Sequence, residues 1–215
     1  MKRNFQKELE AILTRLEERN DLPSLLIHSC CAPCSSYVLE YLSNHFNIIV
    51  YYYNPNIAPK SEYLKRLDEQ VRLVDILNID INEINHFNSN KSADNIKVIC
   101  GDYDQNEFLK RIAGLEEEPE GGLRCIECFK IRLERSAKKA AEIGCEFFTT
   151  TLTVSPYKNA DILNQIGKEA AEKHNVKFLP SDFKKNDGYK RSIVLSKQFG
   201  LYRQDYCGCA FSIRD

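Results

Sequence analysis

The stretch that most constrains this chain is SLLIHSCCAPCSS, residues 24–36. Its first half contains three consecutive aliphatic residues, which predict a short buried strand at residues 25–27. Its second half contains three cysteines within five residues: Cys30, Cys31 and Cys34. Neighbouring side chains of a strand point to opposite sides, so adjacent cysteines can face one object only where the backbone turns. Pro33 disfavours a helical residue before it, so we expect a helix to begin near residue 35.

Composition limits the setting in which these thiols act. A chain of 215 residues can bury about 70% of its unfolded surface, so we expect one metal-binding catalytic domain over residues 1–215. Residues 1–22 would form an N-terminal helical extension. With 30 Lys and Arg against 31 Asp and Glu, a nucleic-acid partner would have to meet a local basic patch.

The same composition predicts where the protein works. No apolar run approaches the roughly 20 residues of a membrane span. The amphipathic, acid-rich N-terminus is unlike a secretory or transit signal. We therefore expect a cytoplasmic protein with no membrane partner, in which nine cysteines indicate metal or redox chemistry rather than structural disulfides.

Hydrophobic periodicity predicts strands that alternate with helices. We expect strands over residues 25–27, 48–52, 79–84, 146–150 and 176–179, and helices over 5–19, 35–45, from a cap at 61, after a cap at 102, 123–144 and 158–173. This alternation predicts an α/β fold of three layers, with a mostly parallel, Rossmann-like sheet and helices on both faces. In the helix from residue 61, the expected inner stripe is Leu64, Leu67, Val71 and Val74.

A second cysteine pair lies at the start of the helix expected over residues 123–144. Cys125 and Cys128 are three residues apart, so their thiols share one face, and the helix N-terminus favours their thiolate form. Together with two cysteines of the first motif they would make a four-thiolate site, which suits zinc or an iron–sulfur cluster. Ligands split between two loops at a sheet edge favour the cluster over a structural zinc site.

The third unit is Cys207-Gly208-Cys209. Its two thiols could bind one metal, or they could close a strained disulfide ring whose electrons exchange easily. A four-ligand site leaves Cys34 and this pair for a second metal or an electron relay, which favours catalysis over a structural role. Cys145 opens an expected strand and is expected in the core.

Other side chains are candidates for contact with RNA. Cations and aromatic rings alternate near the C-terminus: Lys184, Lys185, Tyr189, Lys190, Arg191 and Arg203. Such a mixture suits single-stranded RNA loops, and a solvated helix face explains it equally well. Tyr51, Tyr52 and Tyr53 could stack on a base, although alternation places at least one in the core. His28, inside the first strand, is expected to be a buried histidine with satisfied partners.

Six segments together are similar to one known family. They are HSCCAPCSS, YYNPNIAPKSEY, GGLRCIECFKIRL, TTLTVSPYKN, FKKNDGYKRS and LYRQDYCGCAFS, which extend from about residue 25 to residue 212. In these motifs the chain resembles the QueH family of cobalamin-independent epoxyqueuosine reductases. The resemblance implies the HUP-like (nucleotide-alpha-hydrolase) form of the expected fold.

The resemblance also implies an activity and its cofactors. The reaction is the last step of queuosine synthesis, a two-electron removal of the epoxide oxygen from epoxyqueuosine at the wobble position of tRNA. The family implies a 4Fe–4S cluster, here on Cys30, Cys31, Cys125 and Cys128. It also implies a mononuclear iron, here on Cys34, Cys207 and Cys209, and regards the last two as a redox-active disulfide. An electron donor, which the sequence does not identify, would replenish the site.

Two other functions compete with this interpretation. An ATP-dependent tRNA thiolase on a related fold would carry a glycine- and serine-rich pyrophosphate loop after the first strand, where this chain has cysteines. A zinc-stabilised tRNA-binding module would use four cysteines and leave the others unexplained.

Overall fold

The computed structural model describes residues 3–87 and 95–212, with side chains described outside residues 80–94. Its strands form one sheet in the order β3-β2-β1-β4-β5. The strands are β1 (Ser24–Ser29), β2 (Asn47–Tyr52), β3 (Lys97–Cys100), β4 (Phe147–Thr150) and β5 (Lys177–Phe178). Every pairing is parallel, and β1 is central, because Leu26 lies opposite Ile49 of β2 and Phe148 of β4. The expected α/β fold with a parallel sheet is confirmed.

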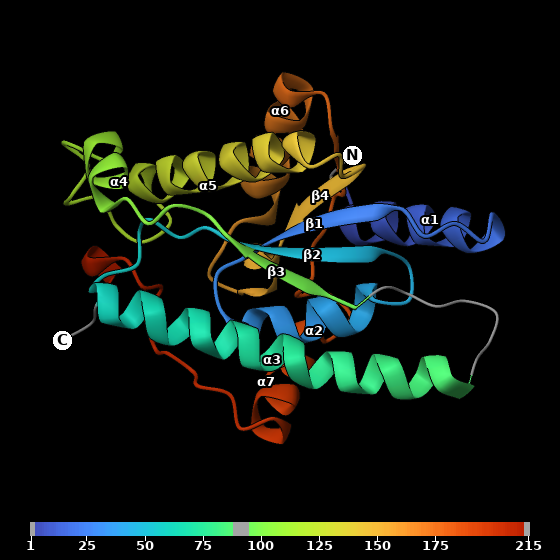
Figure 1. The fold of residues 1–215 in the computed structure, drawn as a ribbon. Helices are drawn as coiled ribbons and strands as arrows, with labels where there is room; N and C mark the ends of the chain where they lie inside the picture. The colour runs from blue at the N-terminus through green and yellow to red at the C-terminus, as the bar shows by residue number, and fades with distance from the viewer. Residues whose placement is uncertain (1–2, 88–94, 213–215) are drawn as a thin grey trace.

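Helices cover both faces of the sheet and make three layers (Figure 1). They are α1 (Phe5–Glu18), α2 (Ala32–Leu42), α3 (Lys60–Phe87), α4 (Gln105–Arg111), α5 (Leu123–Glu142), α6 (Ala160–His174) and α7 (Gly188–Gln198), with short 3-10 helices η1 (Thr151–Val154) and η2 (Ala210–Ser212). One core cluster joins α1, α2, α3 and α7 to the sheet, and another joins α4, α5 and α6 to its opposite face.

The central strand supplies both cores because its side chains alternate. Leu25 and Ile27 belong to the core under α2 and α3, whereas Leu26 belongs to the core under α5. All three are fully buried, as is typical of a strand covered on both faces. In residues 3–87 and 95–212, no helix combines the length and apolar character that crossing a membrane needs.

Three helix boundaries differ from the expectation. α2 begins at Ala32, with Pro33 in its first turn, because a proline there removes an N–H that the helix does not use. Ser61 lies inside α3, which begins at Lys60. The fourth helix is capped by Asp104, whose side chain accepts from the N–H groups of Asn106 and Glu107.

The strand expected over residues 79–84 is wrong. The backbone there continues α3 through Phe87, and the strand that follows is β3, Lys97–Cys100. Ile79 and Ile81 fit the alternation of a strand, whereas Ile81 and Ile84 fit the spacing of a helix. A run of apolar residues this short cannot separate the two. Residues 61–87 contain no glycine or proline, so nothing in the sequence ends the helix earlier.

The buried face of α3 is also rotated from the expected stripe. Leu64 and Val71 are 44% and 40% exposed, whereas Val74 is buried. Among the side chains that the structure describes on this helix, the buried ones are Tyr63, Arg66, Gln70, Leu73, Val74 and Leu77. Hydropathy assigns Arg66 and Gln70 to solvent, although both are buried. An inner stripe predicted from apolar residues alone is therefore misplaced.

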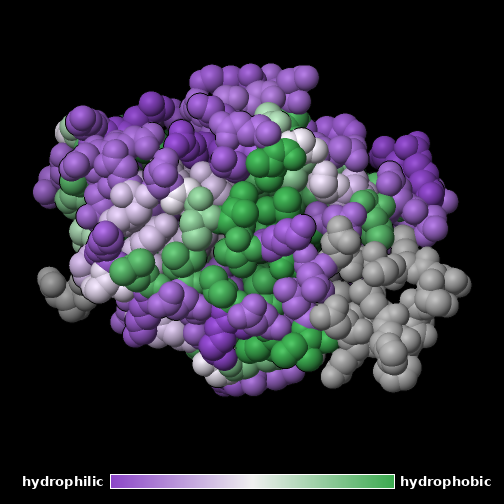
Figure 2. Space-filling model, in the orientation of Figure 1, coloured by the Kyte–Doolittle hydropathy of each residue, from purple (hydrophilic) through white to green (hydrophobic). Residues whose placement is uncertain are grey.

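β3 is an edge strand of the sheet, and this edge faces the viewer in Figures 1 and 2. β3 pairs with β2, and it lies between α3 and α5 in Figure 1. Apolar side chains extend across the middle of this face (Figure 2). Val98 and Ile99 of β3 are accordingly only partly buried.

A matched pair of leucines on α3 tests this orientation. Leu73 is 0% exposed and Leu64 is 44% exposed. We expect Leu73→Ala to lower the free energy of unfolding by about 2–5 kcal/mol, because it leaves a cavity in the core. Leu64→Ala should change it by no more than about 0.5 kcal/mol. Urea unfolding followed by circular dichroism measures both, and equal losses would contradict the orientation of α3.

Candidate metal centre

The sheet delivers its cysteines at the carboxyl ends of the strands. β1 ends at Ser29, and Cys30 follows immediately. β4, the neighbour of β1, runs directly into η1, where Thr151 approaches Cys30 with 3.7 Å between Oγ1 and Sγ. From β1 the chain adds strands first on one side (β2, β3) and then on the other (β4, β5). Parallel α/β sheets bind their ligands at such a switch point, here between β1 and β4.

The strand-to-helix turn brings three sulfurs together. Cys31 is the N-cap residue of α2 in an extended conformation, without a side-chain cap, and Cys34 lies in the first helical turn. The Sγ atoms of Cys30 and Cys31 are 3.7 Å apart. The ligand atoms of Cys30, Cys31 and Cys34 all lie within 4.8 Å of one another, close enough to hold one metal ion.

These three thiols share their protons unequally. Hydrogen bonds from Cys31 and Cys34 hold the pKa of Cys30 well below its ordinary value. The same contact with Cys30 raises the pKa of Cys31 to about 12 and raises that of Cys34 strongly. The group therefore favours one thiolate stabilised by two thiols, and a bound metal would replace the remaining protons.

The second motif lies at the start of α5. The N–H of Gly121 donates to Cys125 Sγ at 3.2 Å, and Gly122, the N-cap, provides no side-chain cap. Burial raises the pKa of Cys128 to about 12. Both thiols line one narrow cavity together with Cys207 and Cys209.

The third motif is held against the loop that follows β2. Gly208 has φ +102°, and a Cβ there would lie 2.9 Å from both Arg66 Nη1 and Ile57 Cγ1. Its carbonyl accepts from the N–H of Ala58 at 2.9 Å. Glycine is therefore required between the two cysteines. Cys207 and Cys209 are free thiols, as are the other seven cysteines.

Two adjoining cavities connect the three motifs. One is lined by Cys30, Cys31, Cys34 and Cys207, and the other by Cys125, Cys128, Cys207 and Cys209. Both share Glu120, Tyr157, Lys158, Cys207 and Ser212. The structure thus gathers all seven motif cysteines around one composite site, with the tightest grouping at Cys30, Cys31 and Cys34.

A buried arginine lies between the cysteine motifs. Arg132 of α5 is 1% exposed and approaches Cys128, with 3.9 Å between Nη1 and Sγ. Burial alone would lower its pKa, but the charges of Cys128, Cys30 and Cys207 outweigh burial and raise it. Its other contacts are Asn54 Oδ1 at 2.7 Å and His28 Nε2 at 3.2 Å.

His28 is a satisfied core histidine, as expected. Its Nδ1 lies 3.0 Å from Thr150 Oγ1, and its Nε2 lies 3.1 Å from the carbonyl oxygen of Tyr53. Burial, followed by the charge of Arg132, lowers its pKa to about 3. The imidazole is therefore neutral, and it adds no charge beside the thiols.

Lys158 and Arg66 also line the first cavity. Desolvation would lower the pKa of Lys158, but the charges of Cys207, Cys30 and Cys34 raise it overall. Arg66 of α3 pairs with Glu62 at 2.6 Å and donates to the carbonyl of Cys207 at 3.2 Å. Within the described part of the chain, its Nη2 is buried with no hydrogen-bond partner.

The residues predicted to contact RNA fall into two groups. Tyr189 and Arg203 line the first cavity. The others lie outside it: Lys184, Lys190 and Arg191 form ion pairs with Asp182, Asp187 and Glu40, and Lys185 lines a separate groove with Lys184.

The proposal that Tyr51, Tyr52 or Tyr53 stacks on a base is wrong. All three side chains are at most 1% exposed. Tyr51 and Tyr53 stack on each other with 5.9 Å between ring centroids, because both point to the same face of the sheet. Cys145 is buried in the core beneath α5, as expected.

Sequence reasoning missed the charged lining of the site. Arg66 and Arg132 are charged residues on helices, and hydropathy assigns such residues to solvent, so nothing local marks them as buried. Tyr157 and Lys158 lie within TTLTVSPYKN, directly after the expected strand 146–150. This position, at the end of a strand of a parallel sheet, was the one sequence feature that could have indicated them.

Comparisons with known proteins identify the family. The family model described as "Epoxyqueuosine reductase QueH" matches residues 25–215. A Staphylococcus epidermidis protein named epoxyqueuosine reductase QueH is 46% identical over 97% of this chain and 84% of its own length. One of the same name from Streptococcus pyogenes is 40% identical over 98% of this chain and 78% of its own length.

A solved structure is also similar, at a lower level. It is described as a predicted subunit of tRNA methyltransferase from Methanocaldococcus jannaschii, with a TM-score of 0.45 and 15% identity over 81% of this chain and 76% of that chain. The family assignment rests on the sequence matches alone. By the extent of the family match and the identity to its curated members, this chain belongs to the epoxyqueuosine reductase QueH family.

Proposed function

We propose that this chain reduces epoxyqueuosine in tRNA to queuosine and that it does so with an iron–sulfur centre. The observation that carries the proposal is the convergence of seven cysteines on two adjoining cavities at the carboxyl edge of the sheet. A structural zinc site would use four of them. The names of the relatives supply the reaction class.

The reaction sets what the site must deliver. Removing the epoxide oxygen breaks two C–O bonds and leaves a C=C bond. Two electrons and two protons enter, and the oxygen leaves as water. An electron donor, a reduced one-electron carrier protein or its chemical substitute, must restore the two electrons after each turnover.

The residues fit the cofactors that the family implies. Cys30, Cys31, Cys125 and Cys128 would hold a 4Fe–4S cluster, and Cys34, Cys207 and Cys209 would hold a second iron or cycle through a disulfide. Such a cluster supplies electrons singly, and an iron with an open position acts as a Lewis acid toward the epoxide oxygen. The buried N–H donor of Arg66 and the N–H of Gly121 suit sulfur acceptors on a thiolate-bound metal centre.

Lys158 is placed to handle one of the protons. It lines both cavities, and thiolate charge keeps its ammonium protonated. We assign its Nζ the role of donating to the oxygen that departs from carbon. Tyr157 beside it is 67% exposed, so its ring suits contact with the modified base at the cavity mouth.

The other residues predicted to contact tRNA differ in their distance from the cavity. Tyr189 and Arg203 line it, so they would contact the modified nucleotide. Lys184, Lys185, Lys190 and Arg191 would meet the backbone farther away, and their existing ion pairs make their contribution smaller.

Loss of a cluster ligand tests the metal assignment. We expect the protein purified without oxygen to be brown and to lose its visible absorption when dithionite is added. Cys125→Ser should contain less than about half the iron and sulfide of the wild type, because a cluster then lacks one of its four thiolates. Cys100→Ser, at an exposed cysteine outside the site, should match the wild type. A colourless wild-type protein that contains zinc instead would contradict the proposal.

The reaction itself tests Lys158. Anaerobic protein, reductant and epoxyqueuosine-containing tRNA should yield queuosine on nucleoside analysis by mass spectrometry. We expect Lys158→Met to lower kcat about 100-fold or more, the range for loss of a positioned proton donor.

Lys168→Met is the matched control, because Lys168 is an exposed lysine on α6. It should retain wild-type turnover. Full activity of Lys158→Met at equal cluster content would remove Lys158 from the mechanism.

A further inference from the structure

We propose that Arg132 is the buried counter-ion of the metal–thiolate centre and that its charge raises the reduction potential of that centre. This inference rests on the proposed function, since it concerns the cluster that the cysteines would hold. Arg132 would act through the cluster as a positioning residue, with no contact to the substrate.

Burial makes the charge of Arg132 significant. The side chain is 1% exposed, and a charge removed from water must be balanced by an opposite charge or by strong hydrogen bonds. It lies on the inner side of α5, at the wall of the cavity that Cys30, Cys31, Cys34 and Cys207 line. Water therefore screens its field poorly in the direction of the sulfurs.

The guanidinium of Arg132 contacts two neutral side chains and one sulfur atom. Asn54 Oδ1 accepts from Nη2 at 2.7 Å, and the neutral His28 lies 3.2 Å from Nε. The remaining nitrogen, Nη1, is directed to Cys128 Sγ at 3.9 Å. The anions that act on Arg132 most strongly are Cys128, Cys30 and Cys207.

Arg66, a buried arginine that lines the same cavity as Arg132, provides the contrast. Its guanidinium already pairs with the carboxylate of Glu62 at 2.6 Å. The net charge of that pair is zero, so its field at the sulfurs is weaker than that of Arg132. The balance of charge within the site therefore depends on Arg132 more than on Arg66.

Asn54 holds the guanidinium in place. Asn54, which accepts from Arg132, also donates to the carbonyl of Ser29 at 2.9 Å, and this ties the arginine to the end of β1. The cation is thus fixed next to the cysteines rather than free to follow a changing charge.

A fixed cation has a defined effect on electron transfer. Reducing the cluster adds one negative charge to a buried site, and a nearby positive charge stabilises the reduced form more than the oxidised form. Removing Arg132 should therefore lower the reduction potential. A lower potential makes the cluster harder to reduce by its donor.

The test is a redox titration of the reconstituted full chain, followed by visible absorbance and electron paramagnetic resonance. Arg132→Met removes the charge and keeps an apolar stem. We expect it to lower the ratio of reduced to oxidised cluster at a fixed potential at least tenfold, which equals 59 mV for a one-electron couple. Arg132→Lys keeps the charge and should shift the ratio by less than Arg132→Met.

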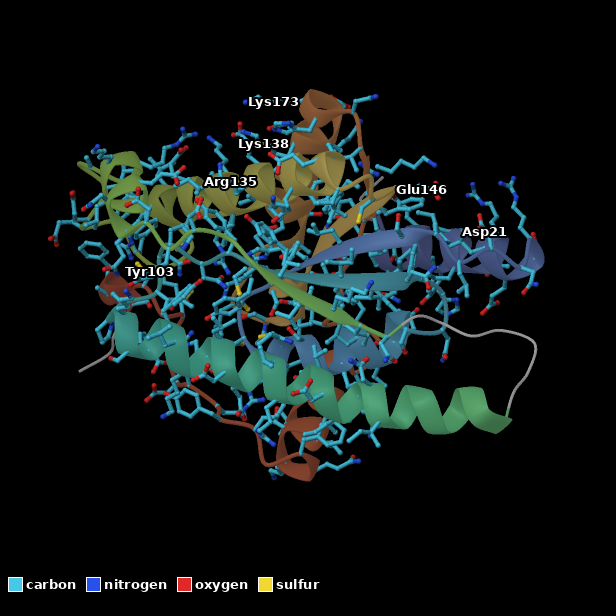
Figure 3. All side chains as sticks on the ribbon, in the orientation of Figure 1. Asp21, Tyr103, Arg135, Lys138, Glu146 and Lys173 are labelled. Atoms are coloured by element: carbon cyan, nitrogen blue, oxygen red, sulfur yellow. The ribbon has the colours of Figure 1, made fainter. Side chains whose placement is uncertain are left out.

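Arg135→Met is the matched control. Figure 3 marks Arg135 on the same helix, where its side chain is 37% exposed and pairs with Asp102 at 3.2 Å. This variant removes the same charge from a solvated position, and it should leave the ratio within twofold of the wild type.

A second variant covers the case in which Arg132→Met holds no cluster. Asn54→Asp places a carboxylate beside the intact guanidinium, and it should lower the same ratio by neutralising the cation. Unchanged potentials in the variants that hold a cluster would overturn this inference and leave the proposed function standing. A wild-type protein that binds no iron would instead overturn the proposed function.

Discussion

The site depends on balancing charge where water is excluded. Its thiols lie at the end of a fully buried central strand, and their thiolate forms would be costly there without nearby cations. Arg132 and Lys158 supply that positive charge from two different elements: α5 and the loop after η1.

The fold brings these groups together through parallel topology. β1 lies between β2 and β4, so the loops after all three strands meet at one edge. The first delivers Cys30 and Cys31, and the loop after β2 holds the segment around Gly208 through the N–H of Ala58. α5, which precedes β4 in the chain, begins at the same edge and delivers Cys125 and Cys128. Residues almost 180 positions apart are therefore neighbours without any long structureless connection.

Buried polar residues connect the sheet to the site. Gln70 of α3 accepts from the hydroxyls of Ser29 and Ser35 at 2.6 and 2.8 Å. This contact fixes the turn between β1 and α2, in which the cysteines stand. The rotated face of α3 has the same explanation, because the helix turns Arg66 and Gln70 toward this turn and leaves Leu64 in solvent. Positioning the turn that carries the cysteines thus has a greater effect on α3 than its own apolar pattern does.

The sequence alone determined the alternation of strands and helices, the parallel sheet and the three cysteine motifs, because those follow from short-range periodicity and spacing. It misplaced the strand at 79–84 and half of the stripe on α3, because short apolar runs satisfy two periods and buried charges are invisible to hydropathy. Only the tertiary structure decided that Arg132 and Lys158 belong to the site and that Tyr51 to Tyr53 do not. Which charge faces which sulfur depends on contacts between residues far apart in the chain, and no local pattern encodes those contacts.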